Sequence, residues 1–74
     1  MMERSDLDNW FTYHAPTDEQ IGRYHRLRLA ARAFADVVFD ELLDSPDRSA
    51  AIRKIREAVM TANAGIACEV EKVD

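Results

Sequence analysis

Aromatic side chains are concentrated near the start of the chain, in the stretch Trp10-Phe11-Thr12-Tyr13-His14. Because large aromatic side chains are usually burial anchors, we interpret Trp10 and Phe11 as folding back over the elements that follow. Tyr13 stands beyond these anchors and three residues before Pro16, where the backbone is extended. Its ring can therefore present a flat face on which a planar ligand stacks.

Basic residues are concentrated between Gln20 and Ala35, a stretch without any acidic residue. Its four arginines are Arg23, Arg26, Arg28 and Arg32. Arg23 and Arg26 lie away from the apolar stripe of the helix expected here, so we interpret them as solvated charges. Arg28 lies at the margin of that stripe, where a charge needs either a carboxylate partner or an anionic ligand. Arg28 is therefore a candidate for binding an anion.

The other ionisable groups indicate neither an enzyme nor a metal site. Four acidic residues stand close together, namely Asp36, Asp40, Glu41 and Asp44. A divalent-ion site is conceivable there, but the carboxylates repel one another and lack a fifth or sixth oxygen donor, so we interpret them as a solvated acidic ridge. His14 and His25 have no second metal ligand and no serine or cysteine partner at suitable spacing. No glycine-rich phosphate loop occurs either, so we expect no catalytic residue, no metal and no cofactor.

The segment after the aromatic stretch carries the signals of a helix start. Thr17 and Gln20 have the spacing of a capping box, and Pro16 can pack on Ile21 as a hydrophobic staple. Apolar residues then repeat with a period near 3.6, at Tyr24, Leu27, Ala31, Phe34, Ala35, Val38 and Leu42. We predict an arm over 1–16 and a first long helix over 17–44.

A second helix is indicated by Ser45 and Pro46, which are typical of an N-cap and a first-turn proline. Its apolar stripe comprises Ile52, Ile55, Val59, Ala62, Ile66, Val70 and Val73. Arg56 and Asn63 flank the stripe, and we interpret Asn63 as making a structural hydrogen bond. The predicted helix covers 46–69, before a tail over 70–74. Because the connection is short, the helices must be antiparallel, and residues 1–74 are predicted to form one all-α domain.

The predicted hairpin is too small to bury all of its apolar residues. A chain of 74 residues is marginal as a monomer, and Cys68 is its only cysteine, so no intrachain disulfide can form. Beyond the two facing stripes lie Ile21, Phe39, Met60 and Ala67. We therefore predict a compact, symmetric oligomer in which other subunits cover these residues.

The charge and hydropathy of the chain limit its partners. Ten Lys and Arg residues against fourteen Asp and Glu residues give a net charge of −4, which disfavours duplex DNA or RNA as a partner. No apolar run approaches the length of a membrane span and no signal peptide is recognisable, so we expect a cytoplasmic protein that does not enter a membrane.

Two short motifs resemble a known family. The sequence Phe-Thr-Tyr-His-Ala-Pro-Thr over 11–17, followed by Gln20, and the sequence Ala-Asn-Ala-Gly-Ile-Ala over 62–67 are similar to phage anti-CBASS cyclic-oligonucleotide sponges. The resemblance implies a hairpin that assembles as a hexamer and sequesters cyclic di- and trinucleotides without cleaving them, which inhibits CBASS immunity in the cytoplasm of the infected bacterial host. In that family an arm tyrosine stacks on a base, and a basic residue fifteen positions later contacts phosphate. This implies ligand-binding roles for Tyr13 and Arg28.

An alternative function is a helical protein–protein interaction module without a small-molecule ligand. In that case the uncovered apolar faces and the acidic ridge would dock a host or phage protein, and the arm aromatics would only close the hairpin. A thermal-shift screen separates the two functions, because a tightly bound ligand raises the apparent stability by mass action.

Overall fold

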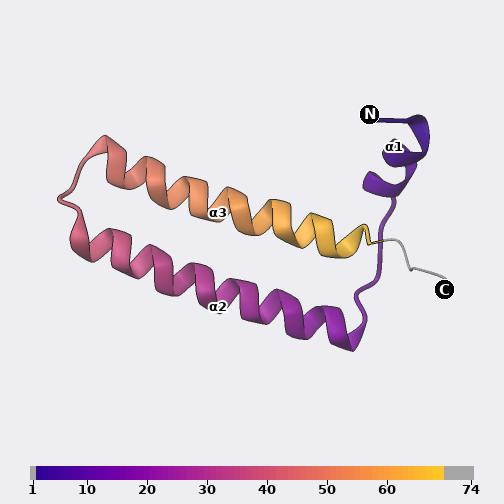
Figure 1. Cartoon of the computed structure of the whole chain (residues 1–74), viewed down its shortest axis with the longest axis horizontal. Helices are drawn as coiled ribbons and strands as arrows, with labels where there is room; N and C mark the ends of the chain where they lie inside the picture. Colours follow the sequence, from indigo (N-terminus) through magenta and orange to yellow (C-terminus); the bar gives the residue numbers. More distant parts are fainter. Residues whose placement is uncertain (1, 70–74) are drawn as a thin grey trace.

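The computed structural model describes residues 2–69, and within them the chain forms three α-helices and no strand. Helix α1 spans Arg4–Trp10, α2 spans Asp18–Glu41 and α3 spans Pro46–Ala67. Helices α2 and α3 pack as an antiparallel hairpin, and α1 lies at its open end (Figure 1). The predicted all-α hairpin is therefore confirmed, and the predicted tail over 70–74 lies outside the described residues. No helix in the described part is long and apolar enough to cross a lipid bilayer.

Helix α2 begins where the sequence predicts. The backbone N–H of Gln20 donates to the Thr17 hydroxyl over 3.1 Å, and the N–H of Thr17 donates to Oε1 of Gln20 over 3.0 Å. These two bonds form the predicted capping box and satisfy donors that the first turn of a helix leaves free. The side-chain amide of Gln20 also donates to the carbonyl of Ile66 over 3.1 Å, so one residue connects the start of α2 to the end of α3.

The corner between the long helices takes up more residues than predicted. Helix α2 ends at Glu41 rather than at 44, and the backbone of Leu42 is extended, with φ −103° and ψ 140°. Ser45, which precedes a proline, is extended as well, so the chain reverses direction over residues 42–45. From that position the Ser45 hydroxyl caps α3 by accepting the N–H of Arg48 over 3.1 Å, as predicted for an N-cap.

The side chain of Arg48 holds the corner together. Its guanidinium donates to the carbonyls of Phe39 and Leu42 over 3.3 and 3.4 Å, and it pairs with Asp44 at 3.3 Å. It also lies over the Phe39 ring, 4.1 Å from the ring centroid. Carbonyl groups left free at the end of α2 are thereby satisfied, which stabilises the early helix end.

The predicted arm contains the short helix α1, which the sequence analysis did not identify. Helix α1 starts with a capping box in which the N–H of Glu3 donates to the Asp6 carboxylate over 2.7 Å. Near its end the side-chain amide of Asn9 donates to the carbonyl of Cys68 over 3.0 Å. Because α3 ends at Ala67 rather than at the predicted 69, this bond attaches the arm directly beyond the end of α3.

Very few side chains are buried in one subunit. Val38 of α2 and Ile66 of α3, each 8% exposed, are the buried apolar residues within 2–69. Phe34, which the sequence places in the stripe facing α3, is 59% exposed. The predicted uncovered residues Ile21, Phe39 and Met60 are exposed, and Ala67 is partly buried. One hairpin therefore has hardly any closed hydrophobic core.

Candidate functional site

Arg28 lies on the rim of a groove of about 270 Å³ between α2 and α3, here termed the Arg28 groove. Its lining consists of Arg28, Ala31, Arg32, Ala35, Ile52, Ile55, Arg56, Val59 and Met60. The groove thus combines an apolar lining with three guanidinium groups from two helices, and none of its lining residues is acidic. Such a surface suits an anion that also has an apolar or planar part.

Arg28 was predicted to need either a carboxylate partner or an anionic ligand, and within residues 2–69 it has no carboxylate partner. The four ion pairs within 2–69 involve Arg23 twice, Arg32 with Asp36, and Arg48 with Asp44. Arg28 takes part in none of them, and the residue one turn further along α2 is another arginine, Arg32. Its guanidinium is therefore free of ion pairs in the described part of the chain, and the anionic ligand stays a prediction.

Tyr13 lies in the extended segment between α1 and α2 and is 85% exposed. The backbone is held on both sides of it. On one side the Thr12 hydroxyl donates to the carbonyl of Asp8. On the other side Nε2 of His14 lies 2.7 Å from the carbonyl oxygen of Asn9, whose side chain is bonded to the end of α3. The ring of Tyr13 is thus presented to solvent from a fixed backbone.

One subunit does not bring Tyr13 and Arg28 into a single groove. Tyr13 precedes α2, whereas Arg28 stands ten residues after its first residue, Asp18. A rise of 1.5 Å per residue places Arg28 about 15 Å along the helix axis. Tyr13 does not line the Arg28 groove, so the aromatic side chain and the guanidinium form no common site within one chain.

Trp10 and Phe11 were predicted to be buried over the open end of the hairpin, and in one subunit they are not. Both side chains are exposed. They border a hollow of about 540 Å³ along the last turns of α3, together with Met60, Thr61, Ala64, Gly65 and Cys68. The aromatic residues therefore lie beside the last turns of α3 and leave an apolar surface open.

Arg23 connects α2 to Glu69, just beyond the end of α3, which corrects its interpretation as a solvated charge. Its guanidinium donates to both carboxylate oxygens of Glu69, over 2.7 and 2.6 Å, and Nε lies 3.2 Å from Glu19. The hydrogen bonds from Arg23 hold the pKa of the Glu69 carboxyl below its ordinary value, and the bond to Glu69 raises the pKa of Arg23. Arg26, in contrast, is exposed as expected for a solvated side chain.

Asn63 does not make its predicted structural hydrogen bond through its carbonyl oxygen. The Oδ1 atom is buried and has no hydrogen-bond partner among the described residues. A buried acceptor without a donor is costly, at about 1–3 kcal/mol. The Asn63 side chain is therefore unsatisfied within one subunit.

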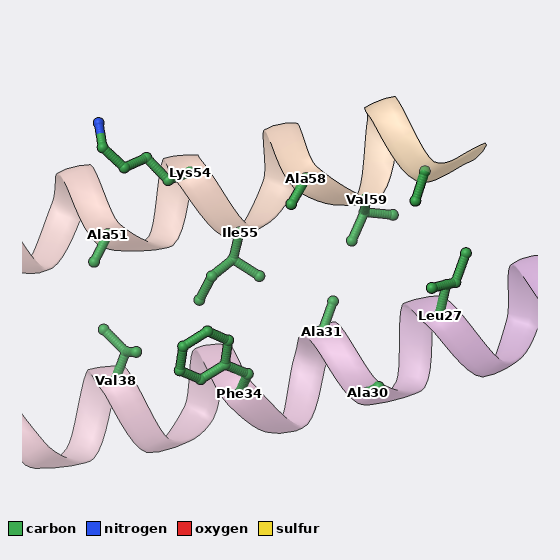
Figure 2. Close-up of a pocket in the computed structure, with 11 residues that line it drawn as sticks. Leu27, Ala30, Ala31, Phe34, Val38, Ala51, Lys54, Ile55, Ala58 and Val59 are labelled. Carbon is green, nitrogen blue, oxygen red and sulfur yellow. The ribbon is translucent and has the colours of Figure 1, made fainter. Parts of the chain in front are cut away.

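A second and larger groove lies between the same helices, here termed the Phe34 groove. It has a volume of about 590 Å³ and is lined by Leu27, Ala30, Ala31, Phe34, Val38, Ala51, Lys54, Ile55, Ala58, Val59 and Ala62. Figure 2 shows Phe34 and Ile55 pointing into the space between the helices, whereas the Lys54 chain extends away from α2. A groove with this largely apolar lining, in which Lys54 is the charged residue, fits an apolar protein surface.

The acidic ridge is partly paired with arginines, since Asp36 contacts Arg32 and Asp44 contacts Arg48. Within residues 2–69, no group of three or more His, Cys, Asp or Glu side chains is arranged to hold a metal ion. Asp36 and Asp44 therefore act as partners of neighbouring arginines in the described part of the chain.

Comparison with known proteins gives one match. Residues 2–67 match the sequence model of a family described as "Acb2/Tad1, hairpin domain". No curated protein and no solved structure matches the chain. The matched range includes all three helices and the segment that carries Tyr13.

Proposed function

The chain belongs to the Acb2/Tad1 hairpin-domain family, and from this membership we propose that it binds cyclic di- and trinucleotides and sequesters them without cleavage. The family is that of the anti-CBASS cyclic-oligonucleotide sponges, whose members are sponges rather than enzymes. By withholding the signal nucleotide from its receptor, the protein inhibits CBASS immunity in the cytoplasm of the infected bacterium.

The observation that carries this proposal is the Arg28 groove. A guanidinium without an ion pair among the described residues, placed beside an apolar lining, suits a phosphate attached to a nucleoside. Arg28 binds the phosphate, and the exposed ring of Tyr13 stacks on a base. Both roles rest on the family motif and agree with the surroundings of the two side chains.

The ligand lies between subunits of a hexamer. Two observations support an assembly. Tyr13 does not line the Arg28 groove within one chain, and the Phe34 groove leaves a large apolar surface uncovered. A second subunit supplies an apolar face to the groove and a tyrosine to the arginine.

Sequestration without cleavage requires that the bound nucleotide is released chemically unchanged. Hydrolysis of a phosphodiester needs a positioned base or a metal-bound water. Within residues 2–69 no group of three or more His, Cys, Asp or Glu side chains is arranged to hold a metal ion, and the arginines that line the groove are always protonated and cannot act as a base. The affinity for the nucleotide then determines how much signal is withheld.

Native mass spectrometry with a panel of cyclic di- and trinucleotides tests the proposal. We expect a hexamer that carries intact nucleotide, and recovery of the unchanged ligand after heating. Linear products formed faster than in a protein-free control would make the protein an enzyme. Absence of any adduct across the panel would remove the sponge function.

A protein–protein interaction module is the second candidate function, and the size of the Phe34 groove favours it. This groove is about 590 Å³, whereas the Arg28 groove is about 270 Å³. In a module, the apolar groove would hold a helix of another protein. Thermal shift separates the candidates, since only a sponge gains stability from cyclic nucleotides.

A further inference from the structure

Three arginines from two helices border the Arg28 groove. Arg28 and Arg32 are four residues apart on α2 and therefore share one face, and Arg56 comes from α3. The apolar lining between them includes Ile52 and Met60. The groove thus has a cation source on each of its two helical sides.

The three arginines differ in their partners. Arg32 pairs with Asp36 at 3.1 Å, one turn further along α2, and both side chains are exposed. Arg28 and Arg56 take part in none of the ion pairs within residues 2–69. Guanidinium groups of like charge around one groove repel one another unless an anion lies between them. Each helix therefore contributes one arginine without an ion pair among the described residues, Arg28 from α2 and Arg56 from α3.

This pattern fits an anion with two separate charges better than an anion with one. A single phosphate can be held by one guanidinium through two hydrogen bonds. A cyclic dinucleotide has two phosphodiester groups on opposite sides of its ring, and the apolar lining between the arginines can cover the sugar and base carbon atoms.

We infer that Arg56 is a second phosphate-binding residue of the Arg28 groove, so that α2 and α3 each hold one phosphodiester of a cyclic dinucleotide. The inference rests on the proposed function and adds a reason why the protein prefers cyclic dinucleotides to cyclic mononucleotides. A ring with two phosphates engages both helices, whereas a cyclic mononucleotide engages Arg28 alone.

Isothermal titration with cyclic di-AMP, cyclic di-GMP and cyclic AMP tests this role in the full-length chain. We expect Arg56→Ala to weaken binding of the dinucleotides by about tenfold to a hundredfold, the usual effect of a hydrogen bond to a charged group. Binding of cyclic AMP should change little. Arg56→Lys should retain part of the dinucleotide affinity, because it keeps the charge but not the paired N–H groups.

Arg53→Ala is the matched control, since Arg53 is an exposed arginine on the same helix and does not line the groove. It should bind every nucleotide like the parent. Sedimentation of each variant shows whether the assembly is intact, and Arg56→Gln provides an uncharged variant that keeps the first part of the side chain if Arg56→Ala fails to assemble.

The outcomes separate this inference from the proposed function. If Arg28→Ala loses binding while Arg56→Ala and Arg56→Gln bind dinucleotides like the parent, Arg56 has no role in the site and the sponge function stands. If the Arg56 variants lose as much affinity for cyclic AMP as for the dinucleotides, Arg56 is a structural residue and the inference is wrong. The same holds if every Arg56 variant fails to assemble. If the parent binds none of the panel, the proposed function itself fails.

Discussion

The Phe34 groove and the Arg28 groove are built by the same two helices and even share the residues Ala31, Ile55 and Val59. Their chemistry nevertheless differs. Eleven residues line the Phe34 groove and Lys54 is the charged one, whereas three of the nine around the Arg28 groove are arginines. One groove is suited to an apolar protein surface and the other to a polyvalent anion.

The difference arises from single steps along each helix. Leu27 and Ile55 line the Phe34 groove, and the next residues, Arg28 and Arg56, line the Arg28 groove. One residue corresponds to a rotation of about 100° on an α-helix, so neighbouring positions can serve opposite purposes. The apolar lining and the basic lining are therefore separated by helix rotation and not by distance along the chain.

The largest effect is expected from a charge placed in the Phe34 groove. Phe34→Asp should dissociate the oligomer and unfold much of the hairpin, because loss of a phenyl contact typically costs about 3–5 kcal/mol and the new carboxylate resists burial. Sedimentation velocity and circular dichroism measure the two effects. Leu43→Asp is the control, since Leu43 is 89% exposed at the corner and the variant should assemble normally. An unchanged Phe34→Asp assembly would show that the Phe34 groove is not an interface.

A change confined to the basic groove should affect binding without affecting assembly. Arg28→Ala is expected to weaken cyclic-dinucleotide binding by about 2–5 kcal/mol, because the phosphate is left in a partly desolvated site without its partner. Arg28→Lys should recover part of this loss, since it restores the charge without the planar fork. Titration calorimetry gives the affinities and sedimentation gives the assembly. If Arg28→Ala binds like the parent or dissociates into unfolded monomers, Arg28 is not a ligand residue.

The arm should contribute less than the groove. Tyr13→Ala is expected to lower the binding free energy by about 1–3 kcal/mol, the usual effect of losing one base–aromatic stack. Tyr13→Phe should bind nearly as tightly, because stacking needs the ring and not the hydroxyl. The same titrations measure both variants. Equal losses in the two would indicate that the hydroxyl, rather than the ring face, contacts the ligand.

The smallest effect is expected from the ion pair of Arg23 with Glu69, which lies outside the Arg28 groove. The pKa of Glu69 is lower in the folded chain because Arg23 donates two hydrogen bonds to it. The pair therefore stabilises the fold above the unfolded-state pKa and loses this effect as the pH falls through the lowered pKa. Glu69→Gln should lower Tm slightly at neutral pH, and the difference from the parent should shrink in acid. A difference that grows in acid would contradict the role of the pair.

Local sequence signals predicted the long helices well but not the arm. Thr17 and Ser45 cap α2 and α3 as predicted, because each bond forms within three residues. Helix α1 was missed although Glu3 and Asp6 form a capping box. It has only seven residues, and its attachment through Asn9 to Cys68 joins positions that are 59 residues apart. Such a contact cannot be deduced from helical periodicity.

The candidate site was predictable only in part for the same reason. Arg28 was identified because its position at the edge of an apolar stripe is visible on a helical wheel. Arg23 was interpreted as a solvated charge, like Arg26, but it pairs with Glu69, which is 46 residues further along the chain. Arg28 and Arg56 line the same groove because of the register in which α2 packs on α3. The periodicity of each helix alone does not determine this register.

The near absence of a closed core in one subunit also has a kinetic consequence. The hairpin needs only the short connection over 42–45 to close, and local contacts of this kind form in microseconds to milliseconds. For the proposed hexamer, we expect the encounter between subunits to be the slow step, at a rate that rises with protein concentration. At low concentration the apolar grooves would stay open and the chain would be exposed to proteolysis, while at high concentration association would protect it. The level of expression, more than the stability of a single chain, would then determine how quickly assembled protein accumulates.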